Sequence, residues 1–494
     1  MASPSSLFVR KPLAALQAEA ERGLLARTLG VRELTALGIG SVIGTGIFVF
    51  TGVAASQHAG PALVISMILS AVACALAGLC YAEFAAMVPV AGSAYTYAYA
   101  TVGELFAWII GWDLVLEYAL ATATVAVGWS GYLVSFLRDV GVHIPLALTG
   151  APGTALKAVD GAPVAGIFNL PAAIIVFVVA GLLIRGIKQS AGVNTLLVVL
   201  KCTVLMVFIA VGAQYIQADN LTPFIPANEG TFGAFGVSGI LRGAGIMFFA
   251  YVGFDSVSTA AQEARNPQRD MPRGMLGSLA ICTVIYIGVA VVLTGIVPYK
   301  QLNVPDPLAV GIDATGVTWL SPFIKISALF GLFSTMIVTM LGQTRVFFSM
   351  SRDGLLPGLF SRVHPRFRTP HASTALVACV IALVAGFTPI NMLGELTSIG
   401  TLLAFVLVSV GIIVLRRTEP NAPRPFHTPL VPWVPIAAAG ACLLQMVSLP
   451  FDTWIRLLVW LALGFVVYFA YGRSRAAGVR RAAAAAAAAS ASAS

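Results

Sequence analysis

Long apolar stretches recur along the whole chain, and each is about as long as the hydrocarbon core of a membrane is thick. A membrane-spanning helix needs roughly 20 mostly apolar residues. Only 10% of the 494 residues are charged and 58% are hydrophobic, whereas a soluble domain has roughly 25% charged and about 45–50% apolar residues. Most of the folded surface must therefore face lipid, and we predict an all-α integral membrane protein with about 12 transmembrane helices.

The predicted spans are separated by short connections. They lie at 33–57, 61–87, 101–134, 168–185, 190–217, 237–262, 275–298, 317–345, 372–388, 394–415, 430–449 and 454–472. The segment 1–32 precedes them, and the alanine- and serine-rich tail 473–494 follows them. The stretch 317–345 is long enough to tilt or to extend into the cytoplasm.

Lysine and arginine are concentrated in alternate connections, and this bias sets the orientation of the helices. With a cytoplasmic N-terminus, the cytoplasmic connections and the tail hold Arg185, Lys188, Arg265, Arg269, Arg273, Arg345, Arg352, Arg362, Arg366, Arg368, Arg416, Arg417, Arg424, Arg473 and Arg475. The opposite connections hold little: Arg138, Lys157, Lys300 and, at a boundary, Arg456. We expect a multi-pass protein of the inner (plasma) membrane with both termini cytoplasmic. The net charge of +9 belongs to this topology, so we expect no nucleic-acid partner.

The first and sixth predicted spans contain glycines where a helix interior disfavours them. The first span has Gly44, Thr45 and Gly46 near its middle, and the sixth has Gly243 and Gly245. Glycine inside a helix costs about 1 kcal/mol against alanine, although close packing of helices through small residues gives a similar pattern. Unwound backbone at this depth is tolerated only around a protein-lined cavity. We therefore predict that both spans are broken.

Two broken helices separated by five spans are typical of two inverted repeats with a binding site between them. A break exposes amides at one half-helix end and carbonyls at the other. Amides suit a carboxylate and carbonyls suit an ammonium group, so the pattern favours recognition of the backbone of an amino acid. Beside the second break, the aromatic residues Phe249, Tyr251 and Phe254 either cover a substrate or are plain packing.

Three stretches, at 40–52, 248–272 and 343–356, carry a resemblance to a known family. From about residue 30 to 472, the chain resembles the amino acid–polyamine–organocation transporters, and most of all the bacterial relatives of the cationic amino acid transporters. The resemblance implies a five-plus-five inverted repeat, proton-coupled or exchange transport of amino acids, and alternating access. It divides the chain into a first repeat at 33–217, a second at 237–416 and two further helices at 430–472. The implied substrate-binding segments are Ile43, Gly44, Thr45 and Gly46, with Phe249, Ala250, Tyr251 and Val252.

Lys201 stands alone in the apolar stretch of the fifth span. A lysine at the membrane centre costs roughly 2.5–3.5 kcal/mol on insertion scales, unless it snorkels to the interface. Lys201 lies more than ten residues from Lys188, at the cytoplasmic start of the helix. At a rise of about 1.5 Å per residue, Lys201 is near the middle of the membrane, too far from the interface for its amine to reach water. The resemblance implies that such a lysine touches the broken first helix, where sodium-coupled relatives bind an ion. Since burial disfavours the charged amine, we predict that Lys201 is the proton-coupling residue.

Carboxylates also occur inside the predicted spans. Asp113 and Glu117 are four residues apart and share a helix face. They are either a structural pair or, as the resemblance implies for Glu117, a group beside the amino group of the substrate. Glu83 lies near the cytoplasmic end of the second span, which favours a structural or gating ion pair over substrate contact. Asp255 follows the second break and is assigned to an inner gate.

These features predict a secondary transporter with no catalytic chemistry, cofactor or metal. No Walker motif is present, which argues against ATP hydrolysis by this chain. A sodium-coupled solute symporter or an amino acid exchanger on the same scaffold stays open, whereas a channel or a membrane-embedded enzyme is disfavoured. The sequence leaves open which amino acids are carried, cationic or small neutral, and the oligomeric state. Arg242 is placed at the external vestibule, and Lys325 and the tail receive no role.

Overall fold

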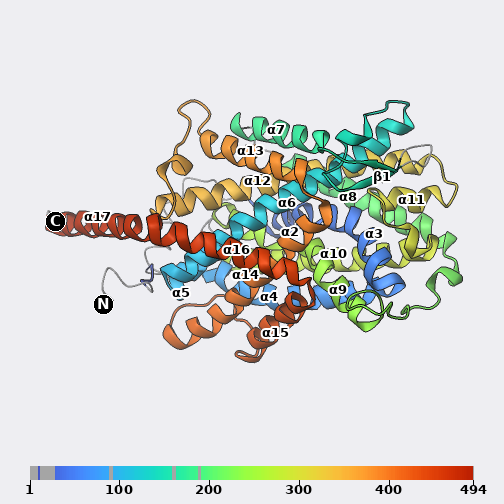
Figure 1. The fold of residues 1–494 in the computed structure, drawn as a ribbon. Helices are drawn as coiled ribbons and strands as arrows, with labels where there is room; N and C mark the ends of the chain where they lie inside the picture. The colour runs from blue at the N-terminus through green and yellow to red at the C-terminus, as the bar shows by residue number, and fades with distance from the viewer. Residues whose placement is uncertain (1–8, 12–27, 88–92, 158–162, 187–190, 493–494) are drawn as a thin grey trace.

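The computed structural model describes residues 9–11, 28–87, 93–157, 163–186 and 191–492. Most of the predicted N-terminal segment and Lys188 lie outside these residues. Figure 1 shows an elongated bundle of helices. Segments from both ends of the chain meet at one end of it, because the Lys11 amide donates to the Tyr99 carbonyl at 3.0 Å and the Arg480 guanidinium donates to the Tyr99 hydroxyl at 3.2 Å. We call this the terminal end, and we call the opposite end the hairpin end.

The first half of the chain is built almost entirely of helix. Its elements are α2 (Val31–Val42), η1 (Gly46–Phe50), α3 (Thr51–Ala54), η2 (Ala55–Ala59), η3 (Gly60–Ala62), α4 (Leu63–Met87), α5 (Ser93–Thr101), α6 (Glu104–Asp139), η4 (Leu146–Leu148), β1 (Ala155–Lys157), β2 (Pro163–Ala165), α7 (Leu170–Ile184), α8 (Ala191–Gly212), η5 (Ala213–Tyr215) and η6 (Ala218–Leu221). The segments η1 and η2 are π-helical. The strands β1 and β2 form an antiparallel hairpin in which Ala155 lies opposite Ala165.

The second half begins with the second broken helix. Its elements are α9 (Gly236–Met247), η7 (Phe248–Tyr251), η8 (Phe254–Glu263), α10 (Pro267–Ile296), η9 (Tyr299–Gln301), α11 (Pro307–Asp313), α12 (Leu320–Arg352), η10 (Gly358–Ser361), α13 (His371–Phe387), α14 (Ile390–Thr418), α15 (Trp433–Ser448), α16 (Phe451–Val467), η11 (Tyr468–Gly472) and α17 (Arg473–Ser492). Helix α10 begins before the predicted residue 275, because proline is well tolerated at the first helical position, which Pro267 occupies.

Among the described residues, eight helical stretches are long and apolar enough to cross a membrane. They are Gly46–Met87, Glu104–Asp139, Thr195–Tyr215, Gly236–Ser258, Pro267–Ile296, Leu320–Arg352, Ile390–Thr418 and Phe451–Ala482. The helices α7, α13 and α15 are also apolar but shorter. Large apolar side chains stand on the outside of the bundle, for example Val284 (73% exposed) and Leu196 (67% exposed), as a lipid-facing surface requires. The all-helical membrane fold is confirmed, while twelve spans and the inverted repeat stay predictions.

The long helices enclose the broken ones. Helix α6 packs against α12 and α14, and α10 packs against both α2 and α4. Serine hydroxyls fix α9 to α4, since Ser66 donates to the Ile240 carbonyl at 2.8 Å and Ser70 donates to the Ala244 carbonyl at 2.7 Å. Polar side chains of this kind commonly join helices inside a membrane. The broken segments are therefore held in the middle of the bundle.

Some elements have no counterpart in the predicted spans. The hairpin of β1 and β2 and the short helix α11 lie at the hairpin end, opposite α17 (Figure 1). The tail is helical through Ser492 and continues α16 by way of η11. Alanine has the highest helix propensity of all residues, so an alanine-rich tail that leaves an existing helix continues it.

Candidate functional site

The first broken helix is interrupted at the predicted glycine cluster. Helix α2 ends at Val42, Ile43 is extended with ψ 94°, and η1 begins at Gly46. Among the described residues, the amides of Gly44 and Thr45 donate to no backbone carbonyl. The Thr45 hydroxyl is also buried without a hydrogen-bond partner there. The break thus leaves buried donors, which is the arrangement that binds a carboxylate.

The second broken helix is interrupted further along than Gly243 and Gly245 suggest. After α9 and the tight turn η7, Gly253 has φ +114° and η8 begins at the next residue. This φ favours glycine, and a Cβ at Gly253 would lie 2.6 Å from the Ser41 hydroxyl. A Cβ at Gly243 would lie 2.7 Å from Ser66 Oγ. Gly243 therefore serves close helix packing, and Gly253 makes the break.

The two breaks touch through their backbones. A Cβ on Gly46 would lie 2.2 Å from the Cα of Ala250, so only glycine fits at this position. The Tyr286 hydroxyl of α10 lies 2.9 Å from the Val42 carbonyl and 3.0 Å from the Ala250 carbonyl, and it links the two broken helices. Sequence reasoning missed Tyr286, because a lone tyrosine in an apolar span is usually packing.

Lys201 is completely buried in α8, and its ammonium group binds the first break. Nζ donates to the carbonyls of Gly40 at 2.8 Å and Ile43 at 2.9 Å, and to Oγ1 of Thr335 at 2.9 Å. The carbonyl end of a helix carries partial negative charge, and each of the three ammonium donors has an acceptor. Gly331 leaves space for the side chain, since a Cβ there would lie 3.1 Å from Lys201 Cε. The backbone of the break therefore holds the charge.

Thr335 on α12 is a site residue that sequence reasoning missed. Besides its contact with Lys201, its Oγ1 lies 3.3 Å from the Gly40 carbonyl and 3.2 Å from the Ile43 carbonyl. A hydroxyl both donates and accepts. Thr335 is therefore able to accept from a charged lysine while donating to a carbonyl, or to donate to a neutral amine. No neighbouring residue in the sequence singles this threonine out.

Three carboxylates gather on the terminal side of the breaks. Asp113 and Glu117 of α6 and Asp255 of η8 are at most 1% exposed, and Glu117 is within electrostatic range of both aspartates. Among the described residues, the oxygens of Asp113 and Glu117 have no hydrogen-bond partner within ordinary distance, whereas backbone amides among residues 253–256 and the Tyr118 hydroxyl lie near the Asp255 carboxyl. Carboxylates buried in this way must hold protons or meet a cation, because an isolated buried charge is costly. The group is therefore suited to an ammonium group or to protons.

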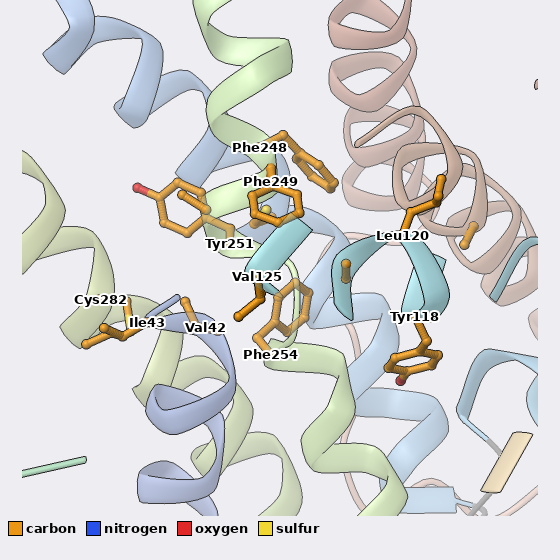
Figure 2. Packing of buried hydrophobic residues seen from close by; sticks show 14 of the residues in the cluster. Val42, Ile43, Tyr118, Leu120, Val125, Phe248, Phe249, Tyr251, Phe254 and Cys282 are labelled. Carbon is orange, nitrogen blue, oxygen red and sulfur yellow. The ribbon is translucent and has the colours of Figure 1, made fainter. Parts of the chain in front are cut away.

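The aromatic residues of the second break have different orientations. Figure 2 shows Phe248, Phe249, Tyr251 and Phe254 around the interruption. The Phe249 ring lies 5.1 Å from that of Phe50, which follows the first break. The Tyr251 hydroxyl instead donates to the Met67 carbonyl of α4 at 3.2 Å. Phe249 therefore spans the two breaks, whereas Tyr251 anchors its segment to α4.

Glu83 lies in an ion-paired cluster near the terminal end. Its carboxylate accepts two hydrogen bonds from Arg416, both at 2.9 Å, and one from the Thr428 amide at 2.7 Å, and it lies 3.3 Å from Nε of Arg424. The Glu83 side chain is fully buried. This cluster joins α4 to the end of α14 and to the chain after it. These partners occupy both carboxylate oxygens, and a structural or gating role for Glu83 stays a prediction.

Lys325 belongs to a network at the hairpin end. Its Nζ lies 2.6 Å from an Asp139 oxygen and 3.9 Å from an oxygen of Asp306, which precedes α11. Burial raises the pKa of Asp306, and the nearby Ser135 hydroxyl and Lys325 partly oppose that change. The network fixes α11 to the ends of α6 and α12.

Comparison with known proteins identifies the kind of protein in which this site occurs. Residues 29–469 match the family model described as amino acid permease. The chain belongs to the amino acid permease family. The predicted resemblance is therefore confirmed, and the protein is a transporter rather than an enzyme.

Relatives of this permease carry several different names. It is 48% identical over 472 residues to a methylthioribose transporter of Bacillus subtilis, covering 96% of this chain and 99% of the relative. It is also 48% identical over 453 residues to the branched-chain amino acid permease BcaP of Bacillus subtilis, covering 92% and 94%. A vacuolar cationic amino acid transporter 4 of Arabidopsis thaliana is 37% identical over 399 residues, covering 80% of this permease and 64% of the relative.

Proposed function

We propose that this permease is a secondary active amino acid transporter that binds the amino acid backbone at its two breaks and couples transport to protons through Lys201. The observation that carries the proposal is the pair of hydrogen bonds from Lys201 Nζ to the carbonyls of Gly40 and Ile43. They connect a protonatable group directly to the backbone that forms the substrate site. A change in the charge of Lys201 therefore acts on the site itself.

The breaks supply both ends of an amino acid with partners. The unpaired amides of Gly44 and Thr45 take the carboxylate, aided by the Thr45 hydroxyl. Glu117, which is buried and lacks a hydrogen-bond partner in the described structure, takes the ammonium group directly or through water. Phe249 closes over the bound molecule from the hairpin end. The side chain of the substrate then faces the walls of the pocket.

Proton coupling follows from the number of donors on Lys201. The charged amine has three N–H groups and matches three acceptors, so it braces the end of α2. The neutral amine has two N–H groups and one lone pair, and Thr335 must then turn its hydroxyl toward Nζ. Loss of the proton weakens the hold on α2. This change allows the first break to move during alternating access.

The proposal includes the architecture expected from the resemblance. Twelve helices form two inverted five-helix repeats and a final pair, with the site at the bilayer midplane. The terminal end faces the cytoplasm, Glu83 and Asp255 belong to an inner gate, and the membrane is the plasma membrane of a bacterium-like cell. An amino acid exchanger and a sodium-coupled symporter are the alternatives. The Lys201 ammonium argues against the symporter, because the resemblance implies that it occupies the volume in which sodium-coupled relatives bind their ion.

The substrate range is proposed to be broad. The names of the relatives include branched-chain and cationic amino acids, and recognition of the backbone tolerates different side chains. Methylthioribose, named for another relative, has neither an ammonium nor a carboxylate group. It leaves the two ends of the site without their charged partners.

A thermal-shift screen of the purified permease tests the function. The twenty amino acids and methylthioribose are added in turn, and the melting temperature is measured. Ligands that bind the folded state raise it. The proposal expects stabilisation by several amino acids and none by N-acetylated or esterified forms of the same compounds. Stabilisation by methylthioribose alone would overturn recognition of the amino acid backbone.

A further inference from the structure

A small cavity with one polar and one apolar wall lies between the two broken helices and α14, on the hairpin side of the central site. It has a volume of about 20 Å³, which is enough room for a water molecule. Its polar wall consists of Gln57 and His58 of η2 and of Asn391 and Glu395 of α14. Asn391 and Glu395 are one helical turn apart and lie on one face of α14.

An aromatic layer separates this cavity from the central site. Phe50 lines the cavity, and its ring lies 5.1 Å from the ring of Phe249. The tip of the Phe50 ring also contacts α14, because a Cβ at Gly394 would lie 2.2 Å from Phe50 Cζ. The residue after Phe249, Ala250, contacts Gly46 of the first break. The ring pair therefore connects the wall of the cavity to the central site.

The wall of the cavity offers acceptors. Oδ1 of Asn391 is buried and has no hydrogen-bond partner among the described residues. Glu395 is a carboxyl group that receives one hydrogen bond from the part of the chain that the structure describes, from the Thr453 hydroxyl at 2.8 Å. His58 Nδ1 lies 2.7 Å from the Gly233 carbonyl, so Nδ1 carries the proton and Nε2 of the neutral ring is an acceptor. An ammonium group has three donors and no acceptor, and it matches this wall.

Charge favours the same ligand. An ionised Glu395 places a negative charge beside the cavity, and Arg242 of α9, Arg456 and Asp452 lie within electrostatic range of it. The Nε of Arg242 donates to the Ser448 carbonyl. Its remaining N–H groups provide positive charge near Glu395. Glu395 and Arg242 attract each other in the absence of a ligand. A bound zwitterion exchanges this attraction for two others, one between its ammonium group and Glu395 and one between its carboxylate and Arg242.

We infer that this cavity is an outer docking site for the ammonium group of an incoming amino acid, with Glu395 as the charged acceptor and Asn391 as the neutral one. The inference rests on the proposed function and on the orientation in which the hairpin end faces outward. The molecule moves on to the central site when Phe50 separates from Phe249. The outer site has only to hold the amino group, so it also binds simple primary ammonium ions.

Thiol labelling of the full-length permease in liposomes tests the inference. Asn391→Cys is introduced together with Cys379→Ser, since Cys379 is the exposed cysteine among the described residues. A membrane-impermeant thiol reagent is applied, and the labelling rate is measured with isopentylamine, N-acetylleucine or sodium chloride. The permease without Asn391→Cys gives the background rate. Leucine thermal shifts are measured in parallel to report the central site.

We expect isopentylamine to slow labelling and N-acetylleucine and sodium chloride to have no effect. Adding Glu395→Gln should raise the half-protecting amine concentration about tenfold, as a loss of about 1.4 kcal/mol does. Glu229→Gln is the matched control, because Glu229 is an exposed carboxylate outside the cavity that pairs with Lys300. Gly46→Ala, or Thr45→Val if that variant does not fold, should keep protection by the amine while losing the leucine shift.

Two results would overturn the outer site. One is protection that survives Glu395→Gln unchanged but disappears in Gly46→Ala, because it would then come from closure around the central site. The other is protection by sodium chloride equal to that by the amine, which would indicate an inorganic cation. Absence of a leucine shift in the unmodified permease with intact amine protection would instead contradict the proposed function and leave the outer ammonium site standing.

Discussion

Replacing Thr335 by valine removes one hydroxyl from the contact between Lys201 and the first break and keeps the shape of the side chain. In the folded permease this hydroxyl accepts from Nζ of Lys201 at 2.9 Å. The other two acceptors are the backbone carbonyls of Gly40 and Ile43, which the substitution does not change. The variant therefore perturbs a single hydrogen bond of the proposed coupling group.

The expected magnitude follows from the donors and acceptors. A charged Lys201 in the variant has three N–H groups and two acceptors, so one buried donor is unsatisfied. Such a group costs about 1–3 kcal/mol, or more when it is charged. A neutral Lys201 keeps two N–H groups for the same two carbonyls and loses only the hydrogen bond that its lone pair accepts from Thr335, which contributes about 0.5–1.5 kcal/mol. The charged state is therefore disfavoured more than the neutral state, and a difference of about 1 kcal/mol between them corresponds to a change of about 5-fold in its population.

Uptake of a radiolabelled amino acid into proteoliposomes measures this change. With an inward proton gradient, Thr335→Val should accumulate several-fold less substrate than the unmodified permease, and a more acidic exterior should restore part of the loss. Exchange of labelled for unlabelled amino acid without a gradient should change less. Thr335→Ser keeps a hydroxyl and should restore accumulation.

Thr294→Val is the matched control for loss of a buried threonine hydroxyl. Thr294 lies on α10, and its hydroxyl bonds only to carbonyls of its own helix among the described residues. This variant should accumulate substrate normally. The reasoning is refuted if Thr335→Val accumulates as well as the unmodified permease at every external pH, since the hydroxyl would then contribute nothing to the charged state.

Further predictions concern the breaks and the buried carboxylates. Gly46→Ala should abolish stabilisation by amino acids while the protein still folds, because its Cβ would lie 2.2 Å from Ala250 Cα; unchanged stabilisation would remove this contact from the site. Glu117→Gln should weaken amino acid affinity more than Glu83→Gln does, as measured by thermal-shift titration. The reverse ranking would contradict the placement of Glu117 beside the ammonium group of the substrate. Glu83→Gln should instead lower the free energy of unfolding by about 3–5 kcal/mol, since it leaves Arg416 and Arg424 without their carboxylate; a melting temperature equal to that of Glu229→Gln would contradict this.

Much of the site could be predicted because its signals conflict with a membrane environment. The cluster at Gly44 marks a break, since glycines interrupt a helix that lipid would otherwise favour. Lys201 is visible for the same reason, because an isolated charge in an apolar span is costly. The structure places the ammonium of Lys201 on the carbonyls beside that break. Each of these residues violates a local rule, so the sequence alone draws attention to it.

The remaining features depend on contacts between distant segments. Thr335 and Tyr286 are ordinary residues for a membrane helix, and only the packing of α12 and α10 brings their hydroxyls to the breaks. The second break lies at Gly253 rather than at Gly243. Glycine in the sequence marks either a break or a close contact with a neighbouring helix, and only the position of that helix, here α4 beside Gly243, distinguishes the two. The outer cavity arises where Glu395 meets residues some 340 positions earlier in the chain, among them His58. The hydrophobic periodicity of the sequence does not predict which distant segments come into contact.

The most direct test of proton coupling through Lys201 is amino acid uptake by proteoliposomes that contain Lys201→Ala. Uptake is measured with and without an inward proton gradient, and with a sodium gradient as control. The account predicts that the unmodified permease accumulates substrate with the proton gradient alone. Lys201→Ala should bind amino acids without accumulating them, and Lys201→Arg should also fail, because arginine keeps its proton. Proton-driven accumulation that persists in Lys201→Ala would contradict the account, and stimulation by sodium alone would favour the sodium-coupled symporter.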